Sequence, residues 1–154
     1  IGMNMKVCGV DLKGNEAVVS LLSLVDGMFH LPDCRVRRLT LADTSAKGLK
    51  SFQSTFAKLV ADYKIDAVII RQRQSKGKFA GSAIGFKLEA AIELIEGLNV
   101  VVMSPTDIKE SLRRNPIAVS FSETGLKQFQ ETAFTSAYAW LMKNEYASQD
   151  SGEL

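Results

Sequence analysis

Histidine is nearly absent from this 154-residue sequence, which contains only His30. Zinc sites built on histidines need more than one, and Ser-His or Cys-His catalysis needs one beside a nucleophile. The two cysteines, Cys8 and Cys34, lack the spacing of metal ligands. We expect both to be buried free thiols in a reducing compartment. These absences argue against histidine-based zinc sites and against histidine-dependent nucleophilic catalysis.

Long apolar runs and a strong net charge are also missing. No apolar run reaches about 18 residues, the length of a candidate membrane span. No signal-peptide pattern opens the chain, so we expect a cytoplasmic protein with no membrane partner. Because 19 Lys and Arg residues balance 17 Asp and Glu residues, the net charge is only +2. A charge this small does not by itself indicate a nucleic-acid partner.

What is present is a globular composition, with 46% hydrophobic and 23% charged residues. A chain of this length buries roughly two-thirds of its unfolded surface, so it needs no disulfide or structural metal to fold. The sequence contains no internal repeat and no linker. We therefore place a single domain at residues 5–147, followed by a frayed tail at 148–154.

The first forty residues predict three strands. Lys6–Val10 reads as a buried strand and Ala17–Leu24 as a second one. Asp26-Gly27 predicts a hairpin turn, because both residues tolerate positive φ. A third strand, from about Arg35 to Leu41, mixes apolar residues with arginines, as expected of an edge strand with a solvated face.

Helical and strand patterns alternate in the rest of the chain. We expect, in order, a helix with an apolar stripe from Leu49 to Tyr63, a strand at Ile65–Ile70, a helix from Ile84 to Ile95, a strand at Val100–Met103, a short helix from Pro105 to Asn115, and a long helix carrying Leu126 to Trp140. Ser120 and Glu123 are spaced for a capping box ahead of the last helix. An antiparallel start followed by βαβ crossovers predicts an α/β fold, with a mixed five-stranded sheet and helices on both faces.

This order of elements, with Gly9-Val10-Asp11 closing the first strand and Gly14 soon after it, resembles the ribonuclease H-like fold. Within that superfamily the chain is most similar to RuvC-type Holliday-junction resolvases, and we interpret it as a small bacterial branch of them. The resemblance implies a nuclease whose carboxylates hold two Mg²⁺ or Mn²⁺ ions, one orienting the attacking water and one stabilising the leaving oxygen. It also implies a homodimer.

The resemblance implies four acids, and this sequence supplies two of them. Asp11 matches the acid of the first strand, and Glu131 matches the first of two acids on the last helix. Arg71 stands where the resolvases have a Glu, and Phe134 stands at the second helical acid. The catalytic and metal-binding candidates are therefore Asp11 and Glu131. Asp11 is either a site residue or a turn-forming residue that receives backbone hydrogen bonds, and Glu131 is either a site residue or an ordinary exposed one.

A basic loop, RQRQSKGKFAGS, follows the strand that ends near Arg71. It leads to a helix start at Gly81-Ser82, where free backbone N–H groups favour anions. We expect nucleic-acid phosphates to bind Lys13, Arg71, Arg73, Lys76, Lys78 and Lys109. The alternative for the loop is that it is an ordinary solvated one. The alternative for Arg71 is an ion pair with Asp11 and Glu131 that takes the place of a metal. Phe79 either stacks on a base or contacts the core.

Three functions follow from this sequence. The first is a ribonuclease H-like domain that binds DNA or RNA and has a degenerate nuclease site. The second is an active Mg²⁺- or Mn²⁺-dependent nuclease on structured DNA or RNA, which needs a further acid such as Glu89 or Asp107 beside Asp11 and Glu131. The third is a non-enzymatic protein-interaction domain.

Overall fold

The computed structural model describes residues 4–78 and 80–152, with side chains as far as Glu145. Its elements are, in chain order, β1 (Met5–Lys13), β2 (Glu16–Val25), β3 (Met28–His30), β4 (Arg38–Thr40), α1 (Ala46–Tyr63), β5 (Ala67–Arg71), α2 (Ala83–Glu93), β6 (Asn99–Met103), α3 (Pro105–Arg114), the 3₁₀ turns η1 (Phe121–Thr124) and η2 (Gln128–Gln130), and α4 (Glu131–Gly152). Among the described helices, none has both the length and the apolar character needed to cross a bilayer.

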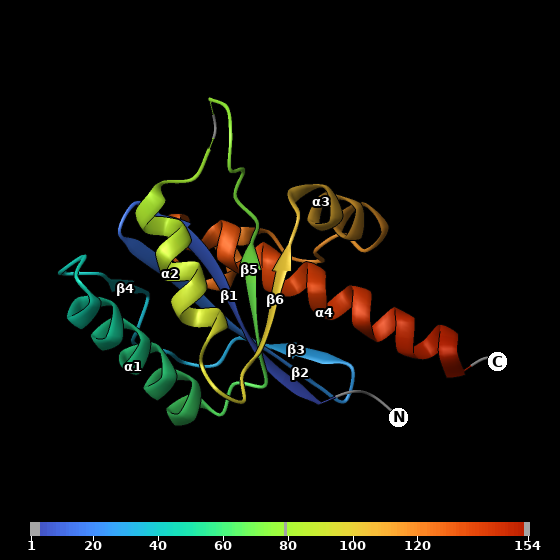
Figure 1. Ribbon diagram of the computed structural model, residues 1–154. Coiled ribbons are helices and arrows are strands. Elements are labelled where there is room, and N and C mark those ends of the chain that lie inside the picture. The colour runs from blue at the N-terminus through green and yellow to red at the C-terminus, as the bar shows by residue number, and fades with distance from the viewer. Residues whose placement is uncertain (1–3, 79, 153–154) are drawn as a thin grey trace.

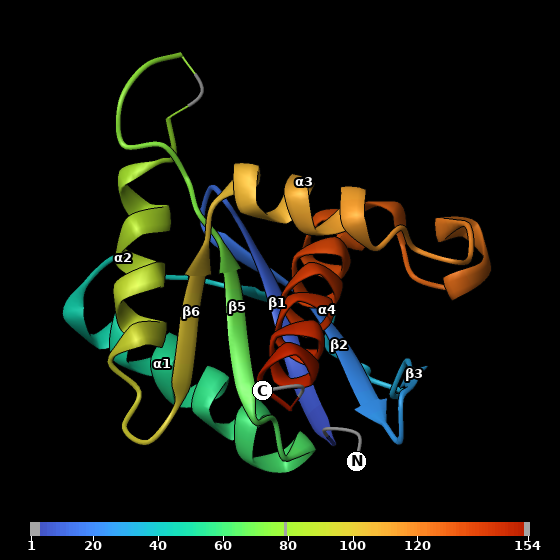
Figure 2. The same cartoon turned by 90° about the vertical axis from the view of Figure 1, so that its right-hand side faces the viewer.

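The sheet has the strand order β3-β2-β1-β5-β6, and β4 also pairs with β2. β1 and β2 are antiparallel, whereas β1, β5 and β6 run parallel. Helices α1 and α2 cover one face of the sheet, and α4 covers the other (Figures 1 and 2). The predicted α/β fold, with its antiparallel start, parallel crossovers and helices on both faces, is therefore confirmed.

The predicted third strand, from about Arg35 to Leu41, is present as the short β4, and a further short strand, β3, lies ahead of it. β3 follows the Asp26-Gly27 turn directly and pairs with the end of β2, while β4 pairs with its beginning. Both turn residues have positive φ, 50° and 79°, as the hairpin prediction required. The chain leaves the sheet between β3 and β4, in a segment that contains Pro32, which has no N–H to donate to a strand ladder.

The start of the last helix also differs from the prediction. α4 begins at Glu131 rather than near Leu126, because Gly125, at φ 76°, interrupts the helical path between η1 and η2. The capping box predicted for Ser120 and Glu123 does not form, and Ser120 instead shares a hydrogen bond with Ser122. At its other end α4 continues to Gly152, into the segment that we expected to fray.

β1 separates two apolar layers, because successive side chains of a strand point to opposite faces. Cys8, Val10 and Leu12 pack with α1 and α2, whereas Val7 packs with α4. Between Val7 and Asp11 on the α4 side lies Gly9, and a Cβ added there would come 1.8 Å from the Ala133 carbonyl oxygen. The glycine thus allows α4 to lie directly on β1. Both cysteines are free thiols, as predicted, but only Cys8 is fully buried, and Cys34 is partly exposed. Burial raises the pKa of the Cys8 thiol.

Candidate functional site

Asp11 and Arg71 lie side by side at the carboxyl ends of β1 and β5. The parallel register pairs Val10 with Ile70, one residue before each of them. Ile69 belongs to the apolar layer under α4, and alternation along the strands therefore directs Asp11 and Arg71 to that same face. Figure 2 shows these strand ends beneath α3 and the base of the long loop. The topology thus brings together two of the residues that the sequence singled out.

An open hollow of about 600 Å³ lies at these strand ends. Its volume is within the range of roughly 300–1,000 Å³ that is usual for ligand sites. β1, β5, the loop after β5, and the first turns of α3 and α4 all contribute to it. Its lining consists of Asp11, Lys13, Arg71, Arg73, Gln74, Ala80, Pro105 and Thr132.

Asp11 is paired with Lys13, not with Arg71. The Lys13 Nζ lies 3.4 Å from the Asp11 Oδ2, and the two side chains are 53% and 5% exposed. Lys13 is two residues further along β1, so its side chain emerges on the same face and reaches Asp11 along the strand. Within the described part of the chain, no carboxylate lies within 4.0 Å of the Arg71 guanidinium. The predicted ion pair of Arg71 with Asp11 and Glu131 is therefore wrong.

The Asp11 carboxylate is unusual because it is buried and poorly satisfied. Among the described residues, no group donates a hydrogen bond to its buried Oδ2. The backbone hydrogen bonds expected of a turn-forming aspartate are likewise missing, since no described N–H group donates to the Asp11 side chain. Buried carboxylates usually accept several hydrogen bonds, so this oxygen still has the capacity to accept one, and Lys13 is the charged group nearest to it.

Glu131 is not brought to Asp11. It is exposed on the first turn of α4, and the next residue, Thr132, lines the hollow in its place. Phe134, at the position where a second helical acid is implied, is only 4% exposed. Its ring lies 6.1 Å from that of Phe121 and 6.2 Å from that of Tyr138. This position of α4 thus belongs to an aromatic core.

The basic loop projects from the strand ends, away from the body of the domain (Figure 1). Lys76 and Lys78 are exposed on it, and Phe79 lies outside the described residues. The base of the loop is held by a 2.8 Å hydrogen bond from the Gly81 N–H to the Gln74 carbonyl. Ser82 caps α2 by accepting a hydrogen bond from the Gly85 N–H, so one of the N–H groups expected to attract anions at this helix start is already satisfied by a side chain.

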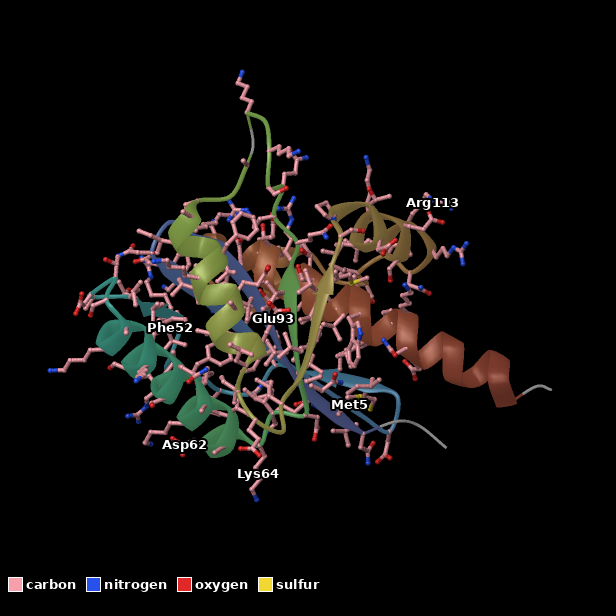
Figure 3. All side chains as sticks on the ribbon, viewed as in Figure 1. Met5, Phe52, Asp62, Lys64, Glu93 and Arg113 are labelled. Atoms are coloured by element: carbon pink, nitrogen blue, oxygen red, sulfur yellow. The ribbon has the colours of Figure 1, made fainter. Side chains whose placement is uncertain are left out.

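The remaining candidates on the short helix lie apart from the hollow. Lys109 is exposed on α3 and is not among the lining residues. Arg113 (Figure 3) and Arg114 lie in the last turn of α3, and both pair with Glu110, at 2.7 Å and 3.1 Å. The basic patch predicted for this helix is therefore partly neutralised within the helix itself.

The donor set does not fit the two-metal centre that the resemblance implies. Mg²⁺ and Mn²⁺ need several oxygen ligands, with carboxylates among them. Asp11 is the only acid in the lining, and it shares the hollow with three cationic side chains. Glu89 instead lines a separate small hollow with Leu12, and Asp107 is exposed on α3. The described residues contain no cluster of three or more acids, histidines or cysteines that would hold a metal.

Sequence reasoning missed the neutral part of this lining, namely Gln74, Ala80, Pro105 and Thr132. Gly9 was a usable signal for Thr132. A glycine in a buried strand indicates that another backbone lies close to it. Here that backbone is α4 at Ala133, so the residue before Ala133, Thr132, lies near the part of β1 that leads to Asp11.

The family model for a protein of unknown function (DUF3010) matches residues 5–140. The chain belongs to this family. A search of the curated proteins finds no match to this family member.

Two solved structures that resemble the DUF3010 chain are both of Thermus thermophilus RuvC. The structure of that protein superposes with a TM-score of 0.67 at 13% identity, covering 95% of this chain and 97% of RuvC. Its complex with a Holliday junction substrate gives a TM-score of 0.64 at 14% identity, covering 95% and 96%. The RuvC-like, ribonuclease H-like fold is confirmed, and identities this low show the fold alone.

Proposed function

We propose that this protein binds the sugar-phosphate backbone of a nucleic acid in the hollow beside Asp11, without two-metal nuclease chemistry. The observation that supports this most is the convergence of Lys13, Arg71 and Arg73 on one hollow that contains a single carboxylate. Arginine donates paired hydrogen bonds to phosphate oxygens, and lysine adds a compact positive charge. This composition suits a phosphodiester and opposes a divalent metal.

The surroundings of the hollow support a strand rather than an isolated phosphate. The loop after β5 projects from the sheet (Figure 1), and Lys76 and Lys78 on it are exposed, so positive charge continues from the strand ends along the loop. A row of cations suits a polyanion, because each phosphate that a cation neutralises releases counterions, and this release favours binding. The RuvC of similar fold is described in complex with a Holliday junction, which makes branched DNA a sensible first probe.

The test measures binding by fluorescence anisotropy, using a labelled four-way junction, a duplex and a single strand over a range of salt concentrations. The double variant Arg71→Ala/Arg73→Ala is expected to weaken binding. It should also make the slope of log affinity against log salt shallower by the amount that corresponds to roughly two phosphate contacts. The matched control is Lys47→Ala/Lys50→Ala, which removes two exposed lysines from α1 on the other face of the sheet. If the wild-type protein bound none of the probes at low salt, the nucleic-acid proposal would be wrong and the protein-interaction function would replace it.

One observation favours the active nuclease as a second candidate. The buried Asp11 Oδ2 receives no hydrogen bond within the described part of the chain, so it is an unused acceptor that a metal ion could take once Lys13 turns away. A cleavage assay on a four-way junction and an RNA–DNA hybrid with Mn²⁺ decides between the two. We expect equal background from wild type and Asp11→Asn. Cleavage that required Asp11 would establish the nuclease.

We also propose a homodimer, which rests on the resemblance to the resolvases. Sedimentation of the 16.9 kDa chain, alone and with a four-way junction, tests it. A single species at the mass of one chain in both samples would contradict it.

A further inference from the structure

The buried Asp11 carboxylate determines one property of any ligand of the hollow, which is that the ligand has to carry a hydrogen-bond donor. Lys13 is half exposed and pairs with Asp11 at 3.4 Å without a hydrogen bond to the buried oxygen. A phosphate entering the hollow attracts the same ammonium, and the flexible side chain can turn towards it. Asp11 would then be left buried without a partner, which is costly unless the ligand itself provides a donor.

The two nucleic-acid backbones differ in this one respect. A deoxyribose-phosphate backbone offers only acceptors, namely the phosphate and sugar oxygens. A ribose backbone adds a 2′-hydroxyl, which is both donor and acceptor, at every nucleotide. A ribonucleotide strand can therefore satisfy the three cations and the carboxylate together, whereas the DNA backbone leaves Asp11 facing acceptors.

We propose that the hollow takes a single strand of RNA, whose 2′-hydroxyl donates a hydrogen bond to the Asp11 Oδ2 while the adjacent phosphate binds Arg71 and Arg73. This inference rests on the proposed function and specifies its substrate class. Gln74 and Thr132 line the same hollow, and their side chains make no hydrogen bond within the described part of the chain. Both are therefore available to the sugar and phosphate oxygens around the bound nucleotide.

The experiment compares three single strands of equal length and sequence: oligouridylate, oligodeoxyuridylate, and 2′-fluoro-oligouridylate. All three carry the same base and phosphates, and the fluorine accepts but does not donate. Oligouridylate is expected to bind roughly tenfold more tightly than the other two, the ratio that one hydrogen bond to a charged group provides. Uridine monophosphate, which holds a single ribose-phosphate unit, is the competitor that separates a nucleotide site from a strand site.

Variants assign the preference to Asp11. Asp11→Ala is expected to abolish the tenfold ratio, and Asp11→Asn, which keeps the size of the side chain, to reduce it to about threefold because a neutral acceptor is roughly half as strong. Asp11→Asn carries the test if circular dichroism shows that Asp11→Ala does not fold. The control is Asp62→Ala on α1, at the opposite end of the domain from the basic loop (Figure 3). It should leave the ratio unchanged.

The outcomes separate this inference from the proposed function. Equal affinity for the ribose and deoxyribose strands, with binding still lost in Arg71→Ala/Arg73→Ala, overturns the RNA assignment and leaves phosphate binding in place. An unchanged ratio in both Asp11 variants overturns the role of Asp11. If uridine monophosphate at the same nucleotide concentration displaces oligouridylate fully, the claim that the hollow takes a strand rather than a single nucleotide is overturned. No binding of any probe overturns both proposals.

Discussion

The two faces of β1 differ in how they are closed. On the side of α1 and α2, Cys8, Val10 and Leu12 are fully enclosed in an apolar layer. On the side of α4, the strand passes from buried Val7, through Gly9 under the α4 backbone, to Asp11 at the rim of an open hollow. One face is uniformly core, and the other changes from core to site within five residues of a single strand.

Because of this difference, the charged side chains that line the hollow gather where α4 begins. A helix that crosses a strand covers part of it and leaves the end beyond its first turn open. The elements α3 and α4 and the loop after β5 meet there, so residues far apart in sequence line one hollow. On the face under α1 and α2, β1 contributes the buried apolar side chains Cys8, Val10 and Leu12, and its role there is stability. The following changes test this comparison, from the largest expected effect to the smallest.

Phe134→Glu puts an acid at the helix position where the resemblance implies one. Because this side chain packs between Phe121 and Tyr138, we expect a loss of at least about 4 kcal/mol in the free energy of unfolding, and no gain of metal-dependent cleavage. Urea denaturation measures the loss. Phe134→Leu, which stays apolar, should cost only about 1.5 kcal/mol. A stable Phe134→Glu protein that bound Mn²⁺ would show that the acid site is still available.

Gly9→Ala tests the contact that closes the α4 face. The added Cβ would meet the Ala133 carbonyl oxygen at 1.8 Å, and α4 has to move to admit it. We expect a loss of about 3 kcal/mol by urea denaturation. Gly14→Ala is the control, since nothing lies within 4 Å of its added Cβ and only its positive φ of 57° opposes the change, at about 1 kcal/mol. Equal losses at the two glycines would remove the argument for close backbone contact.

Two buried serines on the α4 side form a matched pair. Ser111 donates a 2.7 Å hydrogen bond to the Ala139 carbonyl and so ties α3 to α4, whereas Ser20 Oγ has no partner among the described residues. Ser111→Ala should cost about 1 kcal/mol, and Ser20→Ala about zero, because it removes a hydroxyl that is already unsatisfied. Thermal unfolding of both variants measures this. A larger loss from Ser20→Ala would mean that its hydroxyl has a partner in solution.

The smallest effect concerns Glu89, on the α2 side. Burial and, to a lesser extent, the neighbouring Glu93 raise the pKa of this carboxyl above its ordinary value. The folded state thus keeps the proton to a higher pH than the unfolded state, and stability falls as the pH rises from the unfolded through the folded pKa. The fall is at most about 0.5 kcal/mol, since the group is partly exposed. Urea midpoints between pH 4 and about pH 7 should show it in wild type and not in Glu89→Gln.

Local patterns were enough for much of the fold. Apolar runs located β1, β2, β5 and β6, and the Asp26-Gly27 pair located the turn before β3, because these features depend on neighbouring residues. The start of α4 was missed because the apolar stripe continues through Leu126 and Phe129 as if it were helical. Gly125 and the packing of Phe129 against Arg38 at 4.2 Å hold this stretch outside the helix.

For the site, the sequence by itself determined the position of Asp11 at a strand end, the basic character of the loop after β5, and the loss of two of the four implied acids. Only the tertiary structure decided which side chains meet. It selected Lys13 as the partner of Asp11, placed Arg71 and Arg73 in the same hollow, brought in Thr132 instead of Glu131, and buried Phe134 among aromatic rings. The reason is geometric, since the crossing of α4 over Gly9 sets the rotation of the helix, and a rotation of one residue exchanges a carboxylate for a hydroxyl at the hollow.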